Sequence, residues 1–237
     1  MRYPYFQFKQ FAVWHDKCAM KVGTDGVLLG AWTSVKNAQR ILDIGTGTGL
    51  VALMLAQRST PDVTIVALEI DEIGVEQARE NVERSPWSER IEVLHIDFNE
   101  FQADDKFDVI VSNPPYFVDS LACPDLQRNT ARHNESLTYA DLLKGVAGLL
   151  SDTGSFTIVI PTDVAELVKS MAANYQLYAS RQLFVITKPG ANPKRTLITF
   201  AFQAQECQPE ELLIELARHE YSEEYIALTR DFYLKMP

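Results

Sequence analysis

The sequence has little of what disulfide frameworks, metal centres and membrane anchors are built from. Its three cysteines and four histidines are scattered over 237 residues, so we expect neither a disulfide framework nor a metal site. A reducing, cytoplasmic location is the default for such cysteine usage. No apolar run approaches the roughly 20 residues that span a bilayer, and Met1-Arg2 is not followed by an apolar secretory core. We therefore expect no membrane partner.

Positive charge is also scarce, with 22 Lys and Arg against 32 Asp and Glu and a net charge of −10. This balance argues against non-specific nucleic-acid binding, which needs a broad positive field, although a local basic patch can still form a specific RNA site. The length favours one domain. We expect it to comprise an N-terminal extension (1–38), a core (39–204) and a C-terminal strand and helix (205–237). The oligomeric state is left open, with a monomer as the working assumption.

Short apolar runs alternate along the chain with stretches at helical spacing. The predicted strands are 41–44, 64–68, 91–95, 107–111, 155–160, 183–186, 197–202 and 212–216, and the predicted helices are 27–32, 49–57, 71–84, 137–150, 163–171 and 222–234. This alternation is typical of an α/β fold, a mostly parallel sheet with helices on both faces. The connection between the strands 183–186 and 197–202 is too tight for a helical crossover, which predicts an antiparallel edge.

The strongest local motif is a glycine-rich loop that follows the first core strand and opens a helix, Asp43-Ile-Gly45-Thr46-Gly47-Thr-Gly49. Glycines there allow a sharp turn and a close approach to a ligand. The carboxyl ends of parallel strands are where α/β sheets bind ligands. Asp43 would repel the pyrophosphate of a dinucleotide but suits a ligand that carries an ammonium group. A turn without a ligand and a nicotinamide dehydrogenase remain alternatives.

Two further acids follow the next strands. Glu69 ends the second strand, where a carboxylate can accept hydrogen bonds from a ribose diol. Asp97 ends the third strand and could accept a hydrogen bond from an adenine amino group, while Phe98 packs on the ring. An ordinary solvated acid at Glu69 and a cap at Asp97 are the alternatives.

The fourth strand leads into Asn113-Pro114-Pro115-Tyr116. Consecutive prolines fix φ and remove two backbone donors, so the local carbonyl groups have no competing N–H neighbours. The Asn113 side chain and the Pro114 carbonyl could then accept both hydrogens of an amine conjugated to a ring, which returns electron density to its nitrogen. Tyr116 would stack on the ring and hold it in line for attack. A turn that merely stops the strand is the alternative.

These motifs occur in the order found in class I S-adenosylmethionine-dependent methyltransferases, which residues 41–202 resemble. The resemblance implies a Rossmann-like fold, with a seven-stranded mostly parallel sheet, an antiparallel last strand and helices on both faces. It also implies S-adenosyl-L-methionine as the cofactor. The cofactor-binding residues would be Thr24, Asp25, Asp43, Gly45, Thr46, Gly47, Gly49, Glu69, Ile70, Asp97, Phe98 and Asn113. The turn 24–26, which caps the predicted helix 27–32, could equally be a purely structural cap.

The tetrad 113–116 resembles the N/D-P-P-Y/F motif of enzymes that methylate exocyclic or amide nitrogens, and its four residues would be the catalytic ones. Release-factor glutamine methyltransferases carry a helical domain before this core, and ribosomal guanine-N2 enzymes often a duplicated half; 38 residues leave no room for either. The whole chain resembles a family of small bacterial tRNA methyltransferases that act on N6 of adenine 37 in the anticodon loop. Glutamine-N5 or guanine-N2 methylation, and a non-catalytic Rossmann-like RNA- or nucleotide-binding domain, remain alternatives.

A tRNA partner requires a concentrated positive rim on this acidic protein. The candidate residues are Lys188, Lys194, Arg195, Arg128 and Arg132. Together they would contact phosphates and position the RNA without reading its sequence, although each alone could be an ordinary surface charge. An anticodon-loop base is unpaired, so extruding it costs little.

Overall fold

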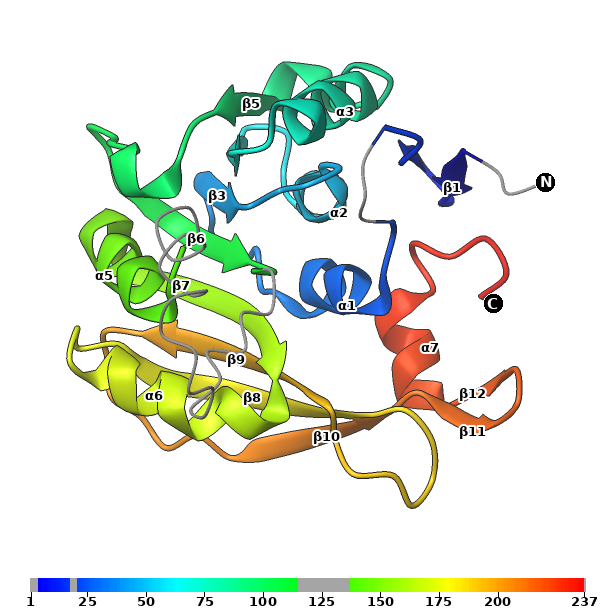
Figure 1. Cartoon of the computed structure of the whole chain (residues 1–237). Helices are drawn as coiled ribbons and strands as arrows, with labels where there is room; N and C mark the ends of the chain where they lie inside the picture. Colours follow the sequence, from blue (N-terminus) through cyan, green and yellow to red (C-terminus); the bar gives the residue numbers. More distant parts are fainter. Residues whose placement is uncertain (1–3, 18–20, 115–136, 237) are drawn as a thin grey trace, which may run out of the picture.

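The computed structural model describes residues 4–17, 21–114 and 137–236 (Figure 1). A central eight-stranded sheet runs in the order β10-β8-β9-β7-β6-β3-β4-β5. Its strands are β3 (Arg40–Ile44), β4 (Thr64–Glu69), β5 (Ile91–His95), β6 (Phe107–Ser112), β7 (Leu150–Pro161), β8 (Tyr178–Ile186), β9 (Arg195–Ala201) and β10 (Pro209–Leu213). Strand β9 pairs antiparallel with β7 and β8, whereas the other pairs are parallel. The predicted mostly parallel, Rossmann-like sheet is confirmed, and so is the antiparallel pairing of β8 with β9, but this pair is not at the edge because β10 lies outside β8.

The expected strand count of seven is wrong by one. Residues Pro209–Leu213 pair parallel with β8 and extend the sheet by an eighth strand. The predicted strand 212–216 captured only part of this segment, because the chain leaves β10 after Leu213 and enters β11 (Glu215–Ala217), which pairs with β12 (Glu220–Tyr221).

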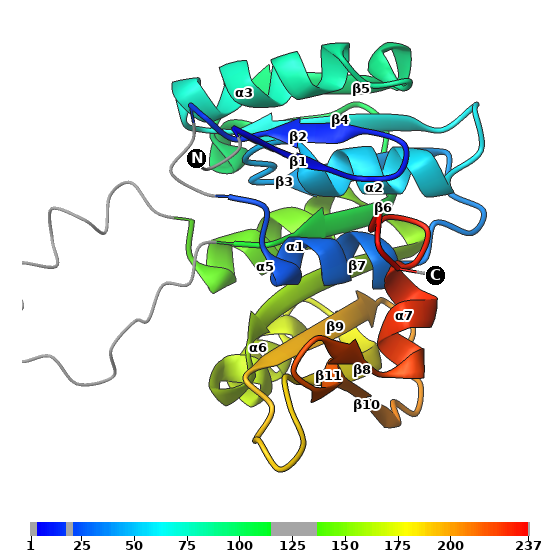
Figure 2. The same ribbon diagram turned by 90° about the vertical axis from the view of Figure 1, so that its right-hand side faces the viewer.

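Helices cover both faces of the sheet (Figures 1 and 2). They are α1 (Thr24–Trp32), α2 (Leu50–Arg58), α3 (Glu72–Glu83), α5 (Tyr139–Leu149), α6 (Ala165–Ala173) and α7 (Glu223–Thr229), with 3₁₀ turns at Ser88–Arg90, Phe98–Glu100 and Thr162–Val164. Helices α1, α2, α3 and α7 share one hydrophobic cluster, and α5 and α6 share the other. None of the helices in the described part of the chain is long and apolar enough to cross a membrane.

The central strands carry apolar residues at both parities because both of their faces are covered. In β4, Ile65 and Ala67 pack into the cluster of α1, α2 and α3, whereas Leu68 packs into the cluster of α5 and α6. Successive side chains of a strand point to opposite faces, so such a strand needs apolar residues at both parities. For this reason the strands were recognised in the sequence as short apolar runs, and not as alternating apolar and polar residues.

The two ends of the described chain lie against each other. Strands β1 (Tyr5–Gln7) and β2 (Ala12–Trp14) form a hairpin, and Phe8 makes a β-bridge with Tyr233. The Lys9 amide donates a hydrogen bond to the Phe232 carbonyl at 2.8 Å. The predicted helix 222–234 is too long, because α7 ends at Thr229 and the chain then turns back towards the hairpin. Both ends therefore contribute to one hydrophobic cluster.

Helix α1 begins three residues before its predicted start. Thr24, Asp25 and Gly26 form its first turn instead of a preceding cap, and the N-cap residue Gly23 makes no side-chain cap bond. The predicted cap at 24–26 is therefore wrong. A Cβ atom at Gly26 would lie 3.1 Å from Leu50 Cδ2 and 3.8 Å from Asn113 Nδ2, so α1 approaches both α2 and the end of β6 closely at this residue.

The packing of α1 on α2 yields a stability prediction at Gly30. A Cβ atom there would lie 2.8 Å from both Cβ and Sδ of Met54, so we expect Gly30→Ala to overpack the contact and cost about 1–3 kcal/mol. Gly148, in the last turn of α5, provides a matched control because a Cβ atom there meets no described atom within 4 Å. Gly148→Ala should be neutral or stabilising. Urea denaturation of both variants measures the difference, and equal stabilities would contradict this account.

Candidate active site

The glycine-rich loop connects β3 to α2 at the carboxyl edge of the sheet. Gly45, Gly47 and Gly49 have φ values of 71°, 58° and 81°, which L-residues with a Cβ rarely adopt. Cβ atoms at Gly45 and Gly47 would meet no described atom within 4 Å, whereas one at Gly49 would lie 3.6 Å from Ala78 of α3. The loop is therefore packed from behind and open in front, as a close backbone approach to a ligand requires.

Asp43 lies beneath this loop and is 1% exposed. Its Oδ2 accepts hydrogen bonds from Thr46 Oγ1 at 2.6 Å and from the Ala52 amide at 3.2 Å. Burial raises the pKa of Asp43 to about 7, the two hydrogen bonds oppose that rise, and the nearby Glu69 carboxylate adds to it. Asp43 thus ties the start of the loop to the first turns of α2 and changes charge near neutral pH.

Glu69 ends β4 and holds the loop from the other side. Its Oε2 accepts a hydrogen bond from the Gly47 amide at 2.7 Å, and its Oε1 accepts from the amides of Ile70 and Asp71 at 3.0 Å each. Ile70 is 54% exposed. A carboxylate has about four lone-pair positions, so Glu69 can accept a further hydroxyl hydrogen while it keeps these three backbone bonds.

Asp97 and Phe98 follow β5 in the neighbouring position. Asp97 caps the 3₁₀ turn Phe98–Glu100, because its Oδ1 accepts a hydrogen bond from the Asn99 amide at 2.8 Å. The Phe98 ring is 7% exposed, and it packs so closely against α5 that a Cβ atom at Gly145 would lie 2.5 Å from it. The alternative interpretation, in which Asp97 is a helix cap, is therefore correct for this contact.

Asn113 and Pro114 follow β6, the strand next to β3. Ser112 pairs with Ile44 in the β3–β6 register, and its Oγ donates a hydrogen bond to the Ile44 carbonyl at 3.0 Å. Asn113 is half-buried and Pro114 is buried. The structure therefore places Asn113 one strand away from the glycine loop and beside Gly26 of α1. Pro115 and Tyr116 lie outside the described residues, as do Arg128 and Arg132.

The first turn of α1 meets the start of β9. Arg195 Nε donates to Asp25 Oδ2 at 2.9 Å, and Arg195 also bonds the Lys194 carbonyl. Asp25 was predicted to bind the cofactor and Arg195 to bind RNA, whereas the structure pairs them with each other. Lys188 and Lys194 are exposed in the β8–β9 loop, which projects beyond the sheet (Figure 2).

A buried polar residue behind the loop was not predicted from the sequence. Asn81 of α3 is fully buried, and its Nδ2 donates to the Thr48 carbonyl at 2.8 Å. The only signal in the sequence was its spacing: Asn81 stands on the same helix face as Ala78, which is buried, and an apolar side chain is expected there.

Comparisons with known proteins define the class. The family model described as methyltransferase small domain matches residues 20–188. A predicted O-methyltransferase from Agrobacterium tumefaciens shares the fold, with a TM-score of 0.68 at 18% identity over 88% of this chain and 96% of that one. A Bacteroides thetaiotaomicron protein named tRNA1(Val) (adenine(37)-N6)-methyltransferase is 72% identical over 236 residues, covering 100% of both chains. A Pasteurella multocida protein of the same name is 47% identical over 97% of this chain and 96% of its own length.

The chain belongs to the methyltransferase small domain family and, within it, to the group whose full-length relatives are named tRNA1(Val) (adenine(37)-N6)-methyltransferase. The predicted class I methyltransferase family and the prediction of an enzyme are confirmed.

Proposed function

We propose that this protein transfers a methyl group from S-adenosyl-L-methionine to the exocyclic N6 of adenine 37 in tRNA1(Val). The observation that carries this proposal is the position of Asn113 and Pro114 at the end of β6, beside the strand that opens the glycine-rich loop. An amine acceptor and a methyl donor can therefore meet at one edge of the sheet. The full-length relatives of that name support adenine 37 as the target. A tRNA substrate places the reaction in the cytoplasm.

The residues around the loop fit the cofactor. The open space in front of Gly45 and Gly47 admits a ligand to the backbone, and the buried Asp43 carboxyl supplies a negative field for an ammonium group. When bound, S-adenosylmethionine supplies a methyl group activated on a sulfonium. The proposed cofactor contacts are Thr24, Asp25, Asp43, Gly45, Thr46, Gly47, Gly49, Glu69, Ile70, Asp97, Phe98 and Asn113.

Asn113 and Pro114 act on the acceptor nitrogen. The N6 lone pair of adenine is delocalised into the ring, which makes the nitrogen a poor nucleophile. Hydrogen bonds from its two N–H groups to the Asn113 side-chain oxygen and the Pro114 carbonyl shift electron density back to nitrogen. Tyr116, which lies outside the described residues, is proposed to stack on the base and keep it in line with the methyl group. A strong base is unnecessary, because the alkylated nitrogen loses its proton readily.

The RNA approaches over the edge that carries the β8–β9 loop. We propose that Lys188 and Lys194 contact phosphates of the anticodon stem-loop, with Arg128 and Arg132 assisting them. The bond between Arg195 and Asp25 assigns Arg195 a second role, because it links the base of this loop to the first turn of α1. The Arg195–Asp25 ion pair thereby connects the loop that we propose to contact RNA with α1, the helix beside Asn113.

Methyl transfer to defined RNA tests the proposal. Purified protein and tritiated S-adenosylmethionine should label an unmodified tRNA1(Val) transcript, and digestion with mass spectrometry should identify N6-methyladenosine. A transcript with guanine in place of adenine 37 is the control and should stay unlabelled. Label at a guanine N2, or in release factors incubated in parallel, would contradict the proposal and select the corresponding alternative substrate.

A further inference from the structure

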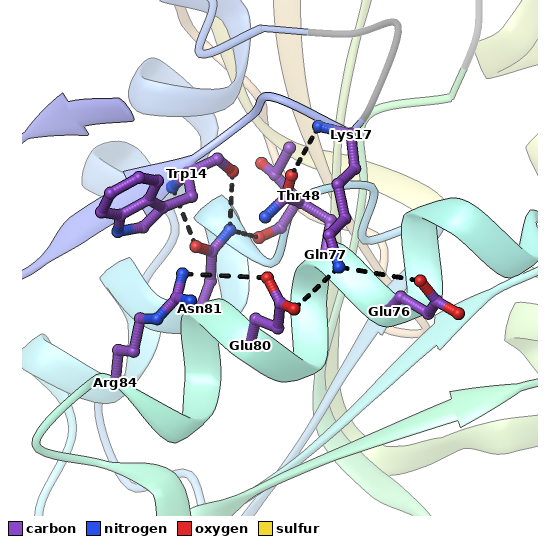
Figure 3. Close-up of polar contacts among 8 residues, drawn as sticks. All are labelled: Trp14, Lys17, Thr48, Glu76, Gln77, Glu80, Asn81 and Arg84. Atoms are coloured by element: carbon purple, nitrogen blue, oxygen red, sulfur yellow. Dashed lines mark hydrogen bonds and ion pairs between the residues drawn. The ribbon is translucent and has the colours of Figure 1, made fainter. Parts of the chain in front are cut away.

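The segment 12–17 lies along α3 and is held there by a stripe of polar side chains (Figure 3). The Lys17 amide donates to Gln77 Oε1 at 3.0 Å, and Lys17 Nζ contacts Glu80 Oε1 at 2.7 Å and Glu76 Oε2 at 3.7 Å. Further along the helix, the Arg84 guanidinium stacks over the Trp14 ring at 4.9 Å from its centroid. Helix spacing brings these side chains to one face.

Asn81 makes the buried contact at the centre of this stripe. Its Oδ1 accepts from the Trp14 amide at 2.8 Å, and its Nδ2 donates to the Trp14 carbonyl at 2.9 Å. The second hydrogen on Nδ2 reaches the Thr48 carbonyl at 2.8 Å (Figure 3). Asn81 is fully buried. One amide thus joins three chain segments: the N-terminal segment, α3 and the glycine-rich loop.

Thr48 directly precedes Gly49, which is the N-cap residue of α2 and has a φ of 81°. Because the peptide between them is planar, holding the Thr48 carbonyl also orients the Gly49 amide. That amide donates to the Thr46 carbonyl at 3.0 Å and so closes the turn of the loop. The contact of Gly49 with Ala78 fixes the same residue from α3. The shape of the loop is therefore tied to whether Asn81 keeps its partners.

We propose that Asn81 is a positioning residue that couples docking of the segment 12–17 to cofactor binding at the glycine-rich loop. The inference rests on the proposed function only in taking an S-adenosylmethionine-type ligand as the occupant of the loop. Cofactor binding orders the loop and thereby fixes the Thr48 carbonyl. This carbonyl holds the Asn81 side chain in place, and Asn81 in turn holds the backbone of Trp14. Such coupling is reciprocal, so a well-docked segment also tightens cofactor binding.

The side-chain chemistry explains why asparagine is required there. Two backbone carbonyls and one backbone amide converge on the residue, which demands two donors and one acceptor from a short side chain. Aspartate would offer only acceptors to the two carbonyls, and leucine would leave all three backbone groups without their partner. Lost partners of buried polar groups are costly.

Hydrogen exchange of the unmodified protein tests the coupling directly. We expect saturating S-adenosylhomocysteine to slow amide exchange in the segment 12–17 by about tenfold, within the usual range of coupling between sites. Exchange in β8 serves as the internal reference and should not change. Unchanged exchange in 12–17 at saturation would overturn the proposal without any variant being made.

Variants then assign the coupling to Asn81. Calorimetry of Asn81→Leu with S-adenosylhomocysteine should give a Kd raised by about tenfold or more, because buried partners are lost, and the ligand should no longer protect 12–17. The matched control is Glu80→Gln, which weakens an exposed contact of the same segment without touching the loop; its Kd should stay within about twofold, as expected for a surface ion pair. A Kd for Asn81→Leu equal to that of the control would overturn the proposal.

A second variant covers the case in which Asn81→Leu does not fold. Trp14→Ala loosens the segment from outside, because it removes the ring contacts with Tyr5 and Arg84 and leaves the Asn81 amide in place. Reciprocity predicts a several-fold weaker Kd. Faster exchange in 12–17 with an unchanged Kd would contradict the coupling. Failure of the unmodified protein to bind the ligand would instead contradict the proposed function, so the two failures are distinguishable.

Discussion

Asn113→Ala is expected to lower kcat for methyl transfer to tRNA by about 10²–10³-fold, the usual cost of losing one preorganised polar group at a reacting atom. The side chain lies at the end of β6, beside α1 and the glycine-rich loop, and removing it leaves only the Pro114 carbonyl to accept a hydrogen from the amine. Cofactor affinity should change far less than kcat, because the loop is held by Asp43, Glu69 and Asn81. Single-turnover kinetics together with calorimetry separates the two effects.

The control for this prediction is Asn113→Asp, which keeps an acceptor oxygen at the same distance from the backbone. It should retain much more activity than Asn113→Ala. Unchanged turnover in the alanine variant, or equal losses in both variants, would show that the acceptor oxygen is not what activates the amine.

Asp43 should make cofactor binding depend on pH. Its carboxyl has a pKa of about 7 in the ligand-free chain, and a cationic ligand nearby favours the ionised form and lowers that pKa. The Kd for S-adenosylhomocysteine should therefore fall by about 30-fold as the pH rises from about 5.5 to 8, since each unit below the pKa costs about a factor of ten. Calorimetry over this range measures the effect.

In the Asp43→Asn variant the dependence should disappear, and the Kd should stay near the value that the unmodified protein shows at low pH. The amide keeps an oxygen for Thr46 and Ala52 but carries no charge. A wild-type pH profile in this variant would rule out Asp43 as its origin.

The Asp43 carboxyl also makes the free energy of unfolding depend on pH. Its pKa is raised from 3.8 to about 7 in the folded chain, so the folded state holds the proton more tightly than the unfolded state. The contribution of Asp43 is therefore most favourable below pH 3.8, and it is lost progressively as the pH rises to about 7. The difference in unfolding free energy between the protein and Asp43→Asn should change by on the order of 4 kcal/mol over this range. Acids that do not interact with Asp43 cancel in that difference.

The glycine-rich loop and the end of β6 were the parts of the site most readily predicted. The glycine-rich loop requires positive φ values, and only glycine adopts them freely, so Gly45, Gly47 and Gly49 mark the turn in the sequence itself. The position of Asn113 followed from its place directly after a buried apolar run. In both cases the prediction depended only on residues that are adjacent in the sequence, and not on contacts between distant segments.

What the sequence did not reveal depends on contacts between distant segments. Parallel pairing of β10 with β8 adds a strand at the sheet edge, and nothing within 209–213 specifies that neighbour. Asp25 and Arg195 are 170 positions apart and were interpreted as ligand contacts, because their ion pair exists only in the folded chain. The early start of α1 has a similar cause, since Gly26 is a weak helix former tolerated where Leu50 and Asn113 approach it.

The bridge between Phe8 and Tyr233 also sets the order in which the molecule can be completed during synthesis. The hairpin that precedes α1 is made long before its partners at Phe232 and Tyr233. Contacts so far apart in sequence form late, and a nascent chain folds as it emerges from the ribosome. Until Phe232 and Tyr233 have left the exit tunnel, the hairpin lacks these partners, so the N-terminal segment completes its packing only after the whole sheet has been synthesised.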